Sequence, residues 1–139
     1  MGYTKKHEIC IPFGFASSNP NDSTEYRFLS VADALDTTYY NRIYLGRSST
    51  VTKVMFMTTS DTAYTDEAQD VILRDAQNSV DYALGTMTKQ AAGVRYSYLL
   101  ADLQHYLPAT AGFQFKMTTP AYVTNPTGLK GYGVIQLLV

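Results

Sequence analysis

The chain has 139 residues, with 11 basic and 12 acidic side chains and a formal net charge of −1. This charge lacks the basic excess of a nucleic-acid-binding protein, so the composition argues against that class. A chain of this length forms one domain whose core needs no metal ion, and its single cysteine, Cys10, excludes an internal disulfide.

Aromatic residues make up 13% of the chain, as 12 Tyr and 6 Phe without Trp, whereas charged residues make up only 17%. Tyr and Thr, both frequent here, favour β-strands. A tyrosine side chain has an apolar body and a polar tip, which suits contacts with other proteins. The composition therefore indicates a β protein with a weakly charged surface.

The first segment, residues 1–22, is interpreted as an N-terminal arm and linker in front of a domain that spans residues 23–139. Within it, "EICIPF" alternates apolar and other residues as a strand does, while Pro12 restricts that strand to a sheet edge or a bulge. The polar run "SSNPNDSTE" then predicts a flexible surface loop between the arm and the body.

The segments that follow repeat their apolar residues with a period of two, which is typical of β-strands. The clearest is "GFQFKMTT", where Phe113, Phe115 and Met117 fall on one face. The closing run "GLKGYGVIQLLV" places Ile135 and Leu137 on one face, and its glycines allow a close approach of neighbouring backbone. Further candidate strands are "EYRFLSV", "NRIYLGR", "VTKVMFMTT", "DVILRD", "VDYALGTM" and "VRYSYLL". We expect an all-β, jelly-roll-like antiparallel β-sandwich of about eight strands.

Two segments have the spacing of short helices. "SVADALDTT" starts on Ser30, a favourable N-cap residue, with Asp33 three residues on. "LLADLQHYL" repeats leucine at helical spacing and is followed by Pro108, which would end a helix. One or two short helices are therefore expected beside the strands.

The sequence contains no recognisable catalytic or metal-binding motif. His7 and His105 lie far apart in the sequence, and His7 and Cys10 would point to opposite faces of a strand. The acidic run "SDTAYTDEAQD" lacks the spacing of a calcium-binding loop, and no phosphate-binding glycine motif is present. We expect no enzyme activity, no catalytic residue, no metal site and no cofactor.

Tyrosines form the remaining feature. Tyr39, Tyr40 and Tyr44 cluster in one region, and Tyr96 and Tyr98 share one face of another strand. Such residues can pack into the core and rim, contact a partner protein, or stack on sugar rings. All three interpretations stay open at the level of sequence.

The order of the segments "RIYLGRSSTVTKVMFMTTSDT", "QDVILRDAQN", "LPATAGFQFKMTT" and "LKGYGVIQLLV" carries a resemblance. From about Ile43 to Val139, the chain resembles the small jelly-roll structural proteins of tailed bacteriophages, which include capsid decoration (cement) proteins and head-fibre domains. This resemblance implies an accessory virion protein, a homotrimer that braces the major capsid protein lattice, with an N-terminal arm and no catalytic residues.

The expected function is therefore that of a capsid decoration protein, made in a host cytoplasm and located on the virion surface, without a nucleic-acid or membrane partner. A carbohydrate- or receptor-binding sandwich, a hydrolase on the same fold and a tail or neck protein are the alternatives. The candidate contact residues are Tyr3, Lys5, Lys6, Ile9 and Phe13 on the arm, and Tyr39, Tyr40, Arg42 and Tyr44 on the body.

Overall fold

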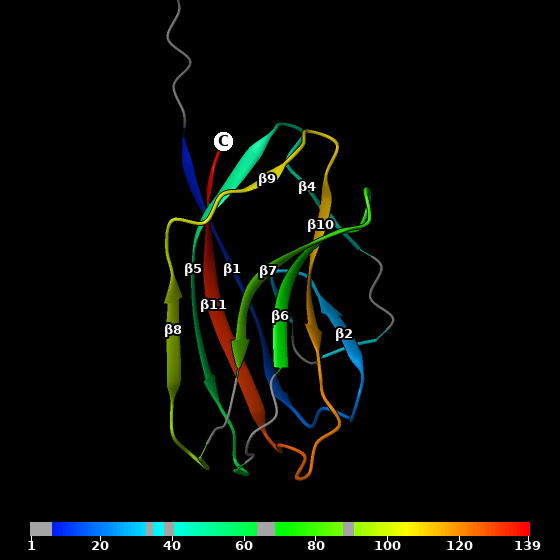
Figure 1. Ribbon diagram of the computed structural model, residues 1–139, viewed down its shortest axis with the longest axis vertical. Coiled ribbons are helices and arrows are strands. Elements are labelled where there is room, and N and C mark those ends of the chain that lie inside the picture. Colours follow the sequence, from blue (N-terminus) through cyan, green and yellow to red (C-terminus); the bar gives the residue numbers. More distant parts are fainter. Residues whose placement is uncertain (1–6, 33–34, 38–40, 64–68, 88–90) are drawn as a thin grey trace, which may run out of the picture.

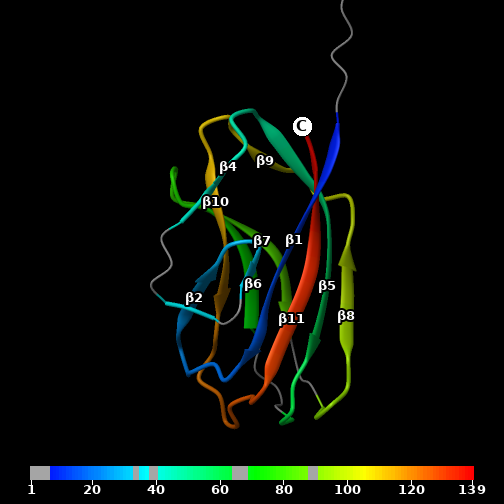
Figure 2. The ribbon, with the colours of Figure 1, turned by 180° about the vertical axis from the view of Figure 1, so that it is seen from behind.

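The computed structural model describes residues 7–32, 35–37, 41–63, 69–87 and 91–139. Two β-sheets pack face to face as a sandwich, and the described residues contain no helix, so none could span a membrane (Figures 1 and 2). The strands are β1 (Glu8–Ser18), β2 (Glu25–Phe28), β3 (Val31–Ala32), β4 (Ile43–Tyr44), β5 (Ser49–Thr59), β6 (Gln69–Asp75), β7 (Val80–Met87), β8 (Tyr96–Leu100), β9 (His105–Leu107), β10 (Gly112–Thr118) and β11 (Leu129–Leu138).

Sheet A contains six strands in the order β3-β1-β11-β5-β8, with β9 also paired to β5. Sheet B contains five strands in the order β2-β10-β6-β7, with β4 also paired to β10. All pairs are antiparallel except the short contact between β1 and β3. The closing strand β11 lies inside sheet A, between β1 and β5, as its apolar sequence predicts.

The core lies between the sheets and is dominated by phenylalanine. The inward side of β10 places Phe113, Phe115 and Met117 at 0% exposure, which confirms the face that their alternation predicts. The ring of Phe115 stacks on that of Phe13 with centroids 4.4 Å apart, and Phe13 stacks in turn on Phe56 at 5.2 Å. This aromatic stack joins the two sheets through β10, β1 and β5.

The expected arm is wrong for the residues that the structure describes. Residues Glu8–Ser18 form β1, whose Phe13 and Phe15 are fully buried, because burying these rings outweighs keeping the segment free. The expected flexible loop is fastened to the turn that precedes β11, since the Gly128 N–H donates to Asn19 Oδ1 at 2.8 Å and the Asn125 amide to Asp22 Oδ1 at 2.8 Å. Residues 1–6 lie outside the described residues.

The expected helix in "LLADLQHYL" is also wrong. Its first residues end β8, and His105–Leu107 form β9, which pairs with β5 as β8 does. Asp102, with φ of 57°, turns the chain between the two strands, and the Leu103 N–H donates to the Thr52 carbonyl at 3.0 Å. Pairing with β5 therefore prevails over the local helical spacing.

The expected helix after Ser30 is wrong at its start. Ser30 itself has φ of 55° and is followed by β3, which pairs with β1. A left-handed residue at this point directs the chain away from a right-handed helix.

Candidate functional site: the outer faces of the sandwich

The outer face of sheet A carries a row of apolar side chains across four strands. Pro12 of β1 pairs with Val134 of β11, Val134 with Met55 of β5, and Met55 with Leu99 of β8. Met55 is 48% exposed and Leu99 63% exposed. We call these four residues the apolar row.

A second row runs beside it through Gly14, Tyr132, Met57 and Ser97. Tyr132 is 50% exposed, and it lines a hollow of about 260 Å³ together with Met57, Thr58, Thr59 and Arg95. Neither row contains a charged residue. The middle of this face is thus uncharged and apolar, a kind of surface that commonly marks a protein contact.

The outer face of sheet B has the opposite character. Lys116, at the centre of the face, lies 2.7 Å from Asp81 and 3.6 Å from Glu25, while Arg74 pairs with Asp81 at 2.8 Å and Arg27 with Glu25 at 2.8 Å. All ion pairs between described residues lie on this face. The charges of this face pair with one another: Lys116 is nearly buried among them, whereas the surrounding carboxylates and arginines stay partly exposed to water.

These ion pairs determine the pKa shifts of the two carboxylates on the outer face of sheet B. Partial burial raises the pKa of Asp81, but hydrogen bonds from Lys116 and Arg74 outweigh burial, so its pKa lies below the ordinary value. Burial likewise raises the pKa of Glu25. The hydrogen bond from Arg27 and the charge of Lys116 outweigh burial, so the pKa of Glu25 also lies below its ordinary value. Both carboxylates are therefore held in their charged form.

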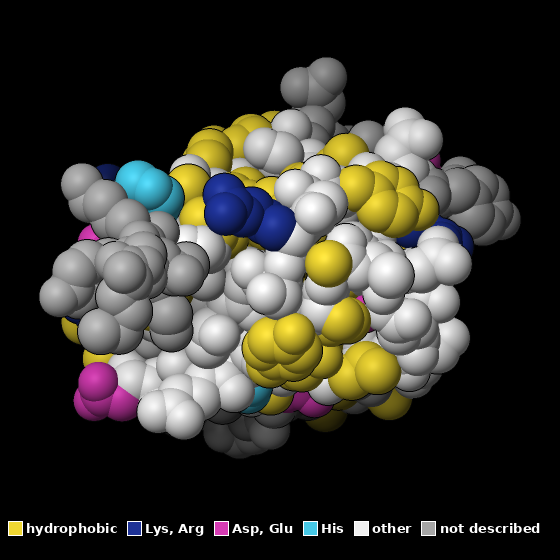
Figure 3. Space-filling model, turned by 90° about the horizontal axis from the view of Figure 1, so that it is seen from above, with side chains coloured by type: hydrophobic (Ala, Val, Ile, Leu, Met, Phe, Trp, Pro, Cys, Tyr) yellow, Lys and Arg dark blue, Asp and Glu magenta, His cyan; other side chains and the backbone are white. Residues whose placement is uncertain are grey.

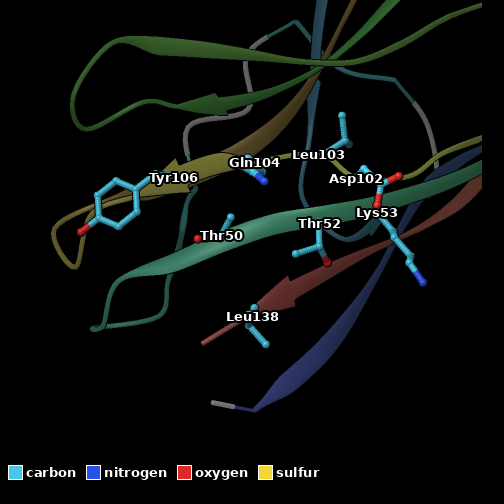
Figure 4. A pocket seen from close by; sticks show the side chains of 8 residues that line it. All are labelled: Thr50, Thr52, Lys53, Asp102, Leu103, Gln104, Tyr106 and Leu138. Carbon is cyan, nitrogen blue, oxygen red and sulfur yellow. The ribbon is translucent and has the colours of Figure 1, made fainter. Parts of the chain in front are cut away.

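A groove of about 480 Å³ lies where the connection from β8 to β9 passes over β5 (Figure 4). Tyr106, 58% exposed, stands at one end, and Lys53 extends away at the other (Figure 4). The side chains of Lys53, Asp102 and Gln104 make no hydrogen bond or ion pair with another described residue. The lining is completed by Thr50, Thr52, Leu103 and Leu138.

Sequence reasoning missed this groove and both rows. The groove is formed by the segment that was expected to be helical, and the rows join residues from four strands.

Seen from the end that carries β9, hydrophobic side chains are spread among uncharged polar ones, and few acidic side chains are visible (Figure 3). The described residues contain no group of three or more His, Cys, Asp or Glu that could hold a metal ion.

The candidate contact residues on the arm fall in different places. Phe13 is not a surface residue: its ring is fully buried in the aromatic stack, because its position on β1 points between the sheets. Ile9 is half-buried and packs against the core. Tyr3, Lys5 and Lys6 lie outside the described residues.

Of the candidates on the body, the structure brings Arg42 and Tyr44 together. Both are exposed and line one shallow hollow, where Arg42 Nη1 donates to Gln77 Oε1 at 2.9 Å and Tyr44 is 59% exposed. This hollow lies beside β4 and β10 of sheet B, away from the apolar row. Tyr39 and Tyr40 lie outside the described residues.

Comparison by sequence gives no match to a protein-family model and none to a curated protein. Comparison by structure matches a chain of the infectious bursal disease virus T13 particle, at TM-score 0.57 and 10% identity over 98% of this chain and 31% of that one. The VP2 subviral particle of infectious bursal disease virus gives TM-score 0.57 and 8% identity over 97% and 33%, and the Gx strain gives 0.51 and 8% over 98% and 32%.

This chain spans about a third of the length of the virus-particle chains that it matches. At such low identity the likeness concerns the fold. The fold is accordingly an all-β, jelly-roll-like antiparallel sandwich, of a kind that also occurs in proteins of virus particles.

Proposed function

We propose that this chain is a virion structural protein, and more narrowly a capsid decoration protein that binds the lattice of the major capsid protein and stabilises the shell. The observation that carries the proposal is the contrast between the two outer faces. Sheet A presents the uncharged apolar row, whereas sheet B presents a network of ion pairs. The likeness of the fold to virus-particle proteins supports the same class.

Docking through sheet A requires no chemistry beyond burial of apolar surface. Met55 and Leu99 are the most exposed members of the apolar row, and burying such side chains contributes about 25 cal/mol per Å² of apolar area. Each contact is modest, but repetition over a lattice raises the effective affinity. The aromatic stack, which joins the sheets, would keep the docked face rigid under load.

Further features belong to the same proposal. The protein acts as a homotrimer on the capsid surface, after synthesis in a host cytoplasm, and it contacts neither nucleic acid nor membrane. Peripheral contacts come from the candidate residues other than the buried Phe13, which are Tyr3, Lys5, Lys6, Ile9, Tyr39, Tyr40, Arg42 and Tyr44.

Co-sedimentation with purified empty shells of the encoding virus tests the proposal. Wild-type protein should pellet with the shells, and Met55→Asp should lower the bound fraction about tenfold or more, because it buries an unpaired charge. Val80→Asp is the matched control, since Val80 is a 39% exposed apolar residue on sheet B. Equal loss in both variants, or no pelleting of the wild type, would contradict the proposal.

A second candidate function, saccharide binding, is favoured by the groove. An exposed tyrosine ring can stack on a sugar, and the side chains of Asp102 and Gln104, which have no hydrogen-bond partner among the described residues, can bond to its hydroxyls. Titration with maltotriose and with N,N′-diacetylchitobiose would separate this function from docking. Binding that Tyr106→Ala abolishes and Tyr96→Ala preserves would favour it, because Tyr96 does not line the groove.

A further inference from the structure

Strand β8 (Tyr96–Leu100) forms an open edge of sheet A. It pairs with β5 along one side and has no strand on the other side among the described residues (Figures 1 and 2). Alternate N–H and C=O groups of an edge strand face outward without a partner strand. The sequence "YSYLL" contains neither a charge nor a proline, and Leu99 is 63% exposed.

Three other edge strands of the described sandwich each carry a feature that hinders pairing. On β1, Pro12 has no N–H to offer, and Gly14 and Phe15 already pair with β3. On β2, the Arg27 N–H donates to the Asp36 carbonyl at 2.7 Å. On β7, the Ala83 carbonyl is engaged by the His105 ring at 3.0 Å. Compared with β1, β2 and β7, strand β8 is therefore open and uncharged.

We propose that β8 pairs antiparallel with β8 of a second copy of this chain. A two-fold axis perpendicular to sheet A keeps the outer face of each copy on the same side. Residues that lie opposite each other in the pair must then be on the same face of the sheet. If the two copies of Tyr96–Leu100 overlap along their whole length, the two-fold axis passes beside residue 98. In this register Ser97 lies opposite Leu99 of the second copy, which sets a small side chain against a large one.

Charges at the two ends of β8 support a second copy as the partner. Arg95 precedes the strand and Asp102 follows it, and both are exposed. Neither side chain forms an ion pair with a described residue. Antiparallel pairing sets Arg95 opposite Ala101 of the second copy, beside that copy's Asp102. An uncharged centre flanked by opposite charges is thus self-complementary.

Pairing of this kind buries a small area, because the strand has only five residues. Interfaces well below about 1,000 Å² are weak and transient by themselves. The contact would gain strength when copies are concentrated on a surface, where it would join neighbouring copies edge to edge. The inference does not rest on the proposed virion role, since it concerns purified protein alone.

Disulfide trapping tests both the contact and its register, in full-length chain that carries Cys10→Ser. Ser97→Cys and Leu99→Cys chains are oxidised separately and as a mixture. The mixture should form a disulfide-linked dimer, because directly opposite residues lie close enough for a disulfide. Each variant alone pairs with itself only diagonally, about 7–8 Å apart, and should stay largely unlinked. No linked dimer in the mixture, or equal linkage by Leu99→Cys alone, would overturn the proposal.

Sedimentation over a range of concentrations separates edge pairing from packing through the face. The mass of the species present at low concentration, monomer or trimer, should double as concentration rises. Leu99→Lys should weaken this step about tenfold or more, because a lysine on an edge opposes strand pairing. Met55→Lys is the matched control, since Met55 lies beside Leu99 in the apolar row but on an inner strand. Equal weakening by both variants would assign the contact to the face and overturn the edge proposal.

Discussion

Gly133 of β11 lies directly opposite Phe13 of β1, and the ring of Phe13 occupies the space that a side chain on Gly133 would need. A Cβ at this position would lie 2.7 Å from the Phe13 ring, 2.6 Å from the Phe56 ring and 2.7 Å from the Met55 carbonyl oxygen. The glycine therefore permits the aromatic stack that joins the two sheets.

Gly133→Ala is expected to lower the free energy of unfolding by about 2–3 kcal/mol, the upper part of the usual cost of overpacking a core, because its Cβ would lie within 3 Å of three neighbours. Chemical denaturation with fluorescence detection measures the change. Gly46→Ala is the control, because a Cβ there has nothing within 4 Å and meets only the strain of φ at 69°. That left-handed strain should cost about 1 kcal/mol. An equal or smaller loss for Gly133→Ala would contradict the close contact with Phe13.

Phe13→Ala should lower the free energy of unfolding by about 3–5 kcal/mol, since it removes a fully buried ring from the stack. Thermal unfolding followed by circular dichroism would report the loss. Ile9→Ala, on the same face of β1 but half-buried, should cost less. Unchanged stability of Phe13→Ala would mean that Phe13 does not pack in the core.

Asp75 supports the turn between β6 and β7 from a fully buried position. Its carboxylate accepts hydrogen bonds from the N–H groups of Gln77, Asn78 and Gly112. Asp75→Ala leaves these donors without their acceptor, so a loss of about 3 kcal/mol is expected from unfolding curves. Asp70→Ala, an exposed carboxylate on the same strand, should change stability by less than about 1 kcal/mol.

Stability should fall in acid through the carboxylates on sheet B. The pKa values of Glu25 and Asp81 in the folded protein lie below their ordinary values of 4.5 and 3.8. Their contribution is complete above those ordinary values and is lost as the pH falls through the lower folded-state values. Because both groups are largely exposed, the effect should be small and should shrink further in high salt.

Unfolding midpoints measured between about pH 2 and pH 7 would record this dependence. Lys116→Met should flatten the acid limb, because Lys116 contacts both Glu25 and Asp81. Lys53→Met is the matched control, since Lys53 pairs with no described carboxylate. A wild-type acid limb that persists unchanged in Lys116→Met would assign the pH dependence to other groups.

Alternation along single strands was enough to predict the sandwich. Phe113, Phe115 and Met117 face the core because a strand turns every second side chain to the same side. The helix expected from Leu99, Leu103 and Leu107 failed because the same spacing also fits two short strands joined at Asp102. Pairing with β5 decides between the two, and that contact is distant in the sequence.

The apolar row could not be predicted from the sequence, for a related reason. Pro12, Met55, Leu99 and Val134 come from four strands, and they meet only in one pairing register. No local pattern encodes that register. The tyrosines, which are conspicuous in the sequence, drew attention to the region around Tyr44 on the other sheet instead.

The position of β11 has a consequence for the order in which the protein can fold during synthesis. Strands β1 and β5 do not pair with each other, and β11 fills the place between them. In a nascent chain that ends before Leu129, the edges of β1 and β5 that pair with β11 have no partner strand, and the core between the sheets is left uncovered. Ribosome-bound intermediates should therefore be sensitive to proteases and prone to aggregate until the last strand emerges.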